Sequence, residues 1–263
     1  MNNQPIGVLD SGVGGLSVWR EIAALLPQES TLYLGDSLNT PYGEKNPNEI
    51  TELTQRMIKF LIEKHVKLIV VACNTITLNS IEALRLDFPD MPLIGTVPVI
   101  KGAATITKNK KIGLLATTAG AESLYIKHLT QEFASGCSVT TVGTDEIVPL
   151  IEKGEVESNE MQKILKKELA AFQKDGIDTL VLGSTHFPFI KPRIQAILGD
   201  AVTVLDSGPA IARQVKRVLE NNSALTEEEN SKHIFYTTGD SAVFAKTAQT
   251  LLGEALEVEE TVL

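Results

Sequence analysis

The amino-acid sequence predicts an α/β protein built from doubly wound, mainly parallel sheets. Short runs of β-branched and aliphatic residues alternate with longer helical segments along the 263 residues, which is the pattern of repeated βαβ units. Several runs, such as 67–73, are almost continuously apolar, as in strands that are buried on both faces of a parallel sheet. Hydrophobic residues make up 43% of the chain, which is enough for a substantial core at this length.

Nine segments have the composition of strands, and the stretches between them are long enough for crossover helices. One expected helix spans 48–63, and a second has apolar residues at helical spacing between 161 and 172. The polar, acidic stretch 221–230 is expected to be an exposed loop or a frayed helix. The predicted strands are 6–10, 31–36, 67–73, 92–96, 111–117, 138–143, 179–184, 202–207 and 233–239.

Small polar residues follow six of the predicted strands, just before an expected helix start. In open α/β sheets, ligands bind outside the carboxyl ends of the strands, where helix N-termini offer N–H groups to an anion. We therefore expect one polar site assembled from distant segments. The six strand ends are Asp10-Ser11-Gly12, Asp36-Ser37, Cys73-Asn74-Thr75, Thr117-Thr118, Ser184-Thr185-His186 and Asp206-Ser207-Gly208.

The two halves of the chain are weakly similar. Cys73 and Ser184 each follow a hydrophobic strand and precede an expected helix, and two strands end in Asp-Ser-Gly. We expect two pseudo-symmetric lobes with the active site in the cleft between them. One lobe comprises 1–97 and 208–263 and carries Asp10 and Cys73. The other comprises 98–207 and carries Ser184 and His186.

Charge and cysteine content exclude several classes of protein. The net charge of −9 argues against direct nucleic-acid binding, which requires a basic surface. No apolar run approaches the length of a membrane span, and the first residues lack the basic segment of a signal peptide. Two cysteines are too few for a disulfide framework, and no metal-binding pattern is present. We expect a cytoplasmic protein.

Cys73 is the strongest candidate for chemistry. It ends the most apolar strand and precedes an expected helix N-terminus, where the helix dipole is expected to lower the pKa of the thiol. It can then act as a nucleophile or as a base for proton transfer. The alternative is a small buried residue at a strand end. Asn74 and Thr75 favour a function, because both can bind a carboxylate or cap the helix.

His186 stands at the equivalent strand end. It can be a general acid or base, a partner that tunes Ser184, or a structural histidine near a turn. A serine hydrolase is a weak alternative, because the motif G-x-S-x-G lacks its second glycine here. Asp10 opens a glycine-rich turn that matches neither nucleotide-binding motif. It is a base, an orienting group or a helix cap.

Single acids and a turn complete the candidates. Pro41, Tyr42 and Gly43 form a turn that can close a site with a backbone amide, although ordinary turn chemistry explains the same residues. Asp36 and Glu152 are isolated acids, and on their own they are expected to be solvated surface charges.

Taken together, the motifs resemble those of the glutamate racemase family, within the aspartate/glutamate racemase superfamily. They occur in the family's order over nearly the whole chain, and as a set they are highly specific. The matching segments are 6–16, 35–37, 41–43, 71–75, 113–117, 182–188 and 206–208.

The resemblance implies an isomerase without cofactor or metal, which supplies D-glutamate for peptidoglycan, and hence for cell-wall biogenesis and cell shape. Two bases must flank the α-carbon of glutamate, since one removes a proton and the other returns one to the opposite face. By resemblance, Cys73 assisted by Asp10 is one base, and position 184 assisted by His186 is the other. The implied substrate contacts are Ser11, Pro41, Tyr42, Gly43, Asn74, Thr75, Thr117 and Thr185, with Asp36 and Glu152 as further acids of the site.

Position 184 departs from the family, because it holds serine where a cysteine is expected. A serine hydroxyl is a far weaker acid than a thiol. Three explanations are open: an engineered substitution in an ordinary racemase, a natural change of role, or slow protonation by Ser184 and His186 through water. The intact neighbours favour the first. The resemblance then implies low turnover, with exchange of the α-hydrogen retained on the Cys73 side, which handles D-glutamate in the family.

Other functions remain open at this stage. They are an aspartate-specific racemase, a non-catalytic binding or regulatory protein on the same fold, and a serine hydrolase. The resemblance also implies a homodimer. The segment 95–100 is similar to the branch of the family whose members can depend on UDP-MurNAc-alanine as an activator.

Overall fold

The computed structural model describes residues 2–228 and 230–263, and it confirms an α/β fold with parallel sheets. The described residues form two units. Unit 1 contains residues up to Thr96 and Gly208–Leu263, and unit 2 contains Val97–Ser207. The sequence placed these boundaries after residues 97 and 207. That the two lobes are separate folding domains stays a prediction.

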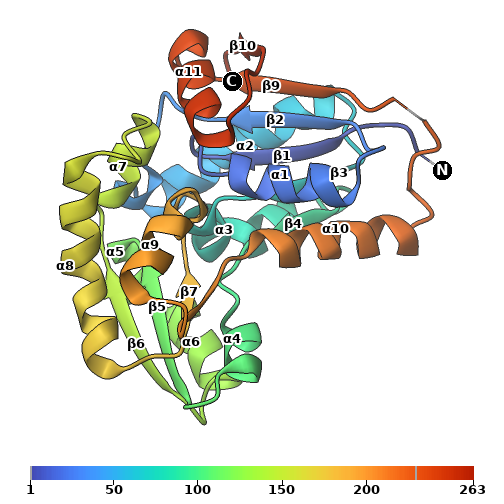
Figure 1. Cartoon of the computed structure of the whole chain (residues 1–263). Helices are drawn as coiled ribbons and strands as arrows, with labels where there is room; N and C mark the ends of the chain where they lie inside the picture. Colours follow the sequence, from blue (N-terminus) through green and yellow to red (C-terminus); the bar gives the residue numbers. More distant parts are fainter. Residues whose placement is uncertain (1, 229) are drawn as a thin grey trace. The chain divides into compact units, whose positions relative to one another are not determined.

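The sheet of unit 1 contains β1 (Ile6–Asp10), β2 (Thr31–Gly35), β3 (Leu68–Val71), β4 (Leu93–Gly95), β9 (His233–Thr237) and β10 (Val258–Glu260). All of its pairings are parallel, and the strand order is β10-β9-β2-β1-β3-β4. β1 therefore has β2 on one side and β3 on the other. Residues late in the chain extend the sheet beyond β2, since β9 pairs with β2 and β10 with β9 (Figure 1).

Helices cover the unit 1 sheet. α2 and α3 pack together, and so do α1 and α10. Successive strand residues point to opposite faces, and Leu9, Ile69 and Val71 join one buried cluster with Met57 and Leu61 of α2. The α2–α3 pair thus covers that face of the sheet. The helices of the unit are α1 (Leu16–Leu25), α2 (Pro47–Glu63), α3 (Asn74–Asp87), α10 (Gly208–Asn221) and α11 (Ser241–Leu252), with a 3₁₀ turn η1 at Tyr42–Glu44.

Unit 2 contains a four-stranded parallel sheet of β5 (Lys111–Ala116), β6 (Ser138–Gly143), β7 (Thr179–Leu182) and β8 (Thr203–Leu205), in the order β6-β5-β7-β8. β5 and β7 are the central strands, and their apolar residues are fully buried. The helices are α4 (Ile100–Ile106), α5 (Thr118–Glu122), α6 (Leu124–Phe133), α7 (Ile147–Glu152), α8 (Asn159–Asp175) and α9 (Lys191–Leu198), with a 3₁₀ turn η2 at Phe187–Ile190.

The two units share one topology. When the first four strands of each unit are numbered in chain order, both sheets have the order 2-1-3-4. In this arrangement the strand order reverses between the first and third strands, and ligands bind at the carboxyl ends of the strands at such a point. Cys73 comes two residues after the third strand of unit 1, and Ser184 comes two residues after the third strand of unit 2. The faint repeat in the sequence thus corresponds to a repeated strand order.

Some sequence predictions need correction. β1 and β6 end where predicted, whereas the other predicted strands end one or two residues earlier, because the polar residues after them leave the sheet. β10 was missed, since its acidic, three-residue sequence lacks an apolar run. Of the six strand ends, only three lead directly into an α-helix, namely those before α3, α5 and α10. Asn221 ends α10 and a loop follows. Glu229, within the predicted stretch 221–230, lies outside the described residues.

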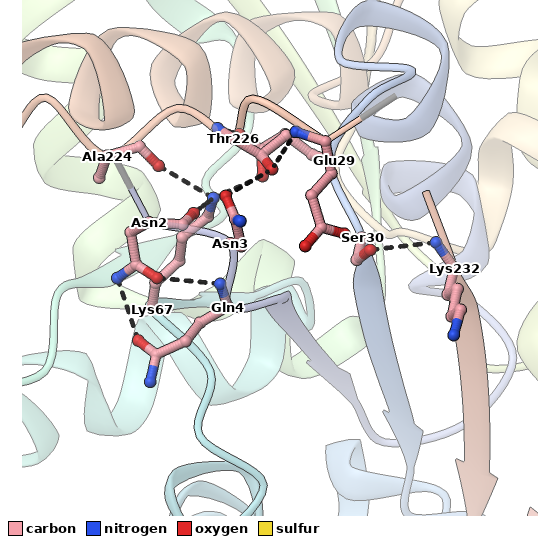
Figure 2. Close-up of polar contacts among 10 residues, drawn as sticks. Asn2, Asn3, Gln4, Glu29, Ser30, Lys67, Ala224, Thr226 and Lys232 are labelled. Atoms are coloured by element: carbon pink, nitrogen blue, oxygen red, sulfur yellow. Dashed lines mark hydrogen bonds and ion pairs between the residues drawn. The ribbon is translucent and has the colours of Figure 1, made fainter. Parts of the chain in front are cut away.

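A buried ion pair holds the amino ends of the unit 1 strands. Lys67 and Glu29 have side chains only 1% and 2% exposed, with Nζ and Oε2 2.5 Å apart. Lys67 also donates to the backbone carbonyls of Asn2 and Ala224, and Glu29 accepts the N–H of Thr226 (Figure 2). The pair therefore fastens the N-terminal segment and the loop after α10 to the sheet. Removing either partner would leave an uncompensated buried charge.

Candidate active site

In unit 1, three candidate residues follow three neighbouring strands. Asp10 ends β1, Asp36 follows β2 and Cys73 follows β3. The backbone continues the strand register past the strands themselves, because Asp36 N–H donates to Asp10 O and Ala72 N–H donates to Leu9 O. The carboxyl ends of β2, β1 and β3 are therefore level, and they bring these side chains to one edge of the sheet.

Cys73 is the N-cap residue of α3 and is 6% exposed. Its Sγ lies 3.6 Å from Oγ of Ser11, so the two side chains share a hydrogen bond. Asn74 and Thr75 form the first turn of α3, where backbone N–H groups are available to an anion. The Nδ2 of Asn74 reaches the carbonyl of Thr96 at 3.4 Å, which orients its amide.

The pKa of the Cys73 thiol is raised to about 12, and not lowered as the sequence predicted. Burial is the main cause, and the negative charge of Asp10 adds to it. Hydrogen bonds from the backbone at Ile76 and Thr75 and from Ser11 oppose this shift but do not outweigh it. The helix N-terminus still favours the thiolate, but burial and the neighbouring carboxylate disfavour it by more.

Asp10 is fully buried in the glycine-rich turn. Its Oδ1 accepts the N–H of Gly12, and Tyr33 donates its hydroxyl to the carbonyl of Gly12. A Cβ on Gly15 would lie 2.5 Å from the Cβ of Asp10 and 2.8 Å from the hydroxyl of Tyr33. The glycine therefore lets the backbone pass close to the acid.

Asp36 is fully buried, so its assignment as a solvated surface charge was wrong. Oδ2 accepts the hydroxyl of Tyr42 at 2.5 Å, and Oδ1 accepts the hydroxyl of Thr238 at 2.6 Å. The amide of Asn39 donates to both oxygens. Sequence reasoning missed Asn39 and Thr238. Asn39 is three residues from Asp36, but Thr238 could be found only as one more polar residue after a strand.

The turn at 41–43 has one buried member. Pro41 is exposed and Gly43 is half-buried, whereas Tyr42 is 2% exposed and belongs to the same buried cluster as Cys73. Burial raises the pKa of Tyr42 far above its usual value, and the charge and hydrogen bond of Asp36 add to the effect. Tyr42 thus remains a neutral hydrogen-bond donor.

In unit 2, the candidates follow the two central strands. Ser184, Thr185 and His186 come after β7 and are each less than 9% exposed. Thr117 follows β5 and caps α5 by accepting the N–H of Gly120 at 3.2 Å. The backbone N–H of Gly183 donates to Leu115 O at 2.7 Å, which keeps the two strand ends together.

His186 is paired with an acid. Its Nε2 lies 2.6 Å from Oε1 of Glu152, the last residue of α7, so the second isolated acid is also not a free surface charge. Ser184 Oγ accepts the backbone N–H of His186 at 3.3 Å. The Glu152–His186 pair supplies the carboxylate that the hydrolase alternative requires, but it equally orients a histidine for proton transfer.

The remaining predicted strand end makes structural contacts. Asp206 Oδ2 lies 2.8 Å from Nζ of Lys191, and Ser207 donates its hydroxyl to the carbonyl of Val97 at 2.8 Å. Three of the six predicted strand ends thus belong to unit 1 and three to unit 2. The strand end at Asp206-Ser207 joins neighbouring segments of unit 2. No helix in the described part of the chain is long and apolar enough to cross a membrane.

Comparison with known proteins shows the family to which the chain belongs. The sequence model of the Asp/Glu/Hydantoin racemase family matches residues 6–215. The chain belongs to this family. Its racemase relatives include a glutamate racemase of Pseudomonas putida, which is 39% identical over 98% of both chains.

Solved racemase structures share the whole fold. A glutamate racemase isoform from Bacillus anthracis superposes with a TM-score of 0.92 at 32% identity, covering 100% of this chain and 99% of the other. A glutamate racemase from Escherichia coli, in complex with L-glutamate and the activator UDP-MurNAc-ala, has a TM-score of 0.86 at 35% identity and covers 98% and 97%. All three relatives carry glutamate racemase in their names, which favours glutamate over the aspartate, hydrolase and binding alternatives.

Proposed function

We propose that this chain interconverts L- and D-glutamate without a cofactor, by proton transfer between two bases on opposite faces of the α-carbon. The observation that carries the proposal is the 39% identity to a glutamate racemase over 98% of both chains. A thiol beside an acid after β3, and a histidine–carboxylate pair after β7, add chemical support.

Cys73 is the proposed base for D-glutamate. Its raised pKa leaves it a thiol in the free protein, and burial and the charge of Asp10 are the causes. The ammonium group of glutamate offsets a carboxylate charge. Substrate binding near Asp10 would therefore lower the pKa of the thiol at the moment when a thiolate is needed. Ser11 is within hydrogen-bonding distance of the sulfur and would steady the thiolate.

Hydroxyl and N–H groups are the proposed partners of the substrate carboxylates. Unit 1 contributes Ser11, the turn at 41–43 and the first turn of α3, with Asn74 and Thr75. Unit 2 contributes Thr117 and Thr185. Such donors also stabilise the negative charge that develops on the α-carboxylate as the α-proton leaves.

Ser184 occupies the place of the second base, where His186 and Glu152 would assist it. A serine hydroxyl is a much weaker acid than a thiol, so Ser184 cannot be matched to Cys73 in proton affinity. We infer that this chain racemises slowly as it stands, and that a cysteine at 184 would restore turnover.

Further properties follow from the same proposal. D-glutamate would enter peptidoglycan, so the enzyme would act in the cytoplasm in cell-wall biogenesis and cell shape. The activator in the Escherichia coli complex supports UDP-MurNAc-alanine as an activator of this chain too. A homodimer is the proposed assembly. No membrane or nucleic-acid partner is proposed.

The test compares the unsubstituted chain with Ser184→Cys. Each protein is supplied with L- or D-glutamate, and the reaction is followed by chiral chromatography. The variant should gain roughly 10²–10⁴-fold in racemisation, the usual contribution of one acid–base group. Aspartate is the control substrate and should react far more slowly. Absence of racemisation in the variant would contradict the proposal and favour a binding role, and faster reaction of aspartate would change the substrate.

A further inference from the structure

A residue after β9 donates a hydrogen bond to the buried carboxylate of Asp36. Thr238 lies just after β9, outside the matched residues 6–215. Its hydroxyl donates to Oδ1 of Asp36 at 2.6 Å and accepts the N–H of Leu38 at 3.1 Å. Its own backbone N–H donates to the carbonyl of Gly35 at 3.1 Å. The end of β9 is thus joined to the start of the loop that follows β2.

The hydroxyl of Thr238 is one of several groups that donate hydrogen bonds to the carboxylate of Asp36. Asp36 is fully buried, and its carboxylate receives donors from Tyr42, Asn39 and Thr238, all of them neutral groups. Hydrogen bonds to a buried carboxylate are strong, and losing one leaves the charge poorly satisfied. Removing the Thr238 hydroxyl should therefore displace the loop rather than leave it in place.

The loop carries a residue that lies in the same buried cluster as the candidate base. Tyr42 donates to Oδ2 of Asp36 and belongs to the same buried cluster as Cys73. A chain of contacts therefore runs from Thr238 through Asp36 to Tyr42. We propose that Thr238 is a positioning residue, which holds the loop 36–43 over Cys73 and so sets the geometry for substrate binding.

The first test needs no substrate. In a Cys137→Ser background, alkylation of Cys73 by iodoacetamide is compared among Thr238→Val, Thr238→Ser and Thr250→Val. Thr250 is the matched control, because its exposed hydroxyl donates only to a carbonyl within its own helix, that of Lys246. Loosening the loop should speed alkylation about tenfold in Thr238→Val. Thr238→Ser keeps the hydroxyl and should stay within about twofold of the parent, as should Thr250→Val.

The second test is kinetic and rests on the proposed function. In the Ser184→Cys background, Thr238→Val should raise KM for glutamate about tenfold with kcat nearly unchanged, because the loop contributes to substrate and transition state alike. Thr238→Ser should restore KM. If Thr238→Val does not fold, Thr238→Ala is measured below its own unfolding temperature and carries the same expectation.

The outcomes separate the two claims. Alkylation that is unchanged in Thr238→Val, or equally fast in Thr238→Ser, overturns the positioning role whatever the protein catalyses. Fast alkylation with an unchanged KM also overturns it. Fast alkylation in a parent that does not racemise glutamate supports the contact chain and contradicts the proposed function instead.

Discussion

The carboxyl ends of β3 and β7 are equivalent places in two sheets whose first four strands have the same order, yet they hold different proton chemistry. After β3, a buried thiol lies beside a hydroxyl and near a buried acid. After β7, a hydroxyl accepts a backbone N–H, and the neighbouring histidine is paired with Glu152. Topology thus determines where a group stands, while burial and charge determine whether it can exchange a proton.

The two strand ends also differ in what each lacks for proton transfer. Burial raises the pKa of Cys73 and the negative charge of Asp10 adds to the effect, so the thiol needs a nearby cation before it can become a thiolate. At the other strand end, His186 is oriented by Glu152, but the side chain beside it at position 184 is a hydroxyl and not a thiol. Substitutions on one side at a time separate the contributions of the two strand ends.

The largest expected effect concerns the reactivity of Cys73. A pKa of about 12, against an ordinary value of 9.0, leaves a thiolate fraction about a thousandfold smaller at neutral pH. In a Cys137→Ser protein, the rate of alkylation should therefore be very low at pH 7 and keep rising through pH 10. The measurement is the rate of iodoacetamide labelling by mass spectrometry at each pH.

Cys137 serves as the control. It is only partly buried, and in a Cys73→Ala protein it should label faster at pH 7 than Cys73 does in the Cys137→Ser protein. A plateau in Cys73 labelling below pH 9 would mean that the helix N-terminus outweighs burial and the charge of Asp10.

An intermediate effect is expected from Glu152→Gln in the Ser184→Cys background. The substitution keeps the shape but removes the charge that holds His186, so kcat/KM should fall about tenfold or more. The fall must be equal in both directions, because the two enantiomers have equal free energy in solution. Proton exchange of D-glutamate without inversion should persist, since it uses Cys73 alone. Loss of that exchange would refute the assignment of Glu152 to one side.

The smallest effect is one of stability, at the amino end of the unit 2 sheet. Burial would raise the pKa of Asp178, but hydrogen bonds from Thr107, Asn109, Lys108 and Thr179 lower it to about 2, against an ordinary 3.8. The lowered pKa means that the ionised carboxylate stabilises the folded protein. This contribution to folding stability is complete above about pH 4 and is lost as the pH falls towards 2. Asp178→Asn should cost about 1–2 kcal/mol at pH 7, allowing for solvent screening.

The measurement for Asp178 is urea unfolding at pH 7 and at low pH, where the difference from the parent should shrink. Asp145→Asn is the matched control, because Asp145 accepts one backbone N–H, from Thr118. Proton exchange of D-glutamate should be unchanged in both variants. An equal cost of Asp178→Asn at both pH values would contradict the origin of the effect in an ionised carboxylate.

Much of this arrangement could be predicted from the sequence. Apolar runs located nine of the strands, because buried parallel strands need apolar residues on both faces. Polar residues after those runs located Cys73, Ser184 and His186. The burial of Asp36 could not be predicted, since it depends on Thr238, about two hundred residues away. The raised pKa of Cys73 was also missed, because local sequence reveals a helix start but not desolvation.

Exchange of the α-hydrogen in deuterated water, measured by NMR on the unsubstituted chain with D- and L-glutamate separately, distinguishes the two strand ends. A competent Cys73 and an incompetent Ser184 together predict deuterium incorporation into D-glutamate with retention, and far less into L-glutamate. Cys73→Ala should abolish the exchange. Equal, fast exchange and racemisation from both enantiomers would contradict the account, because Ser184 would then be a full partner of Cys73.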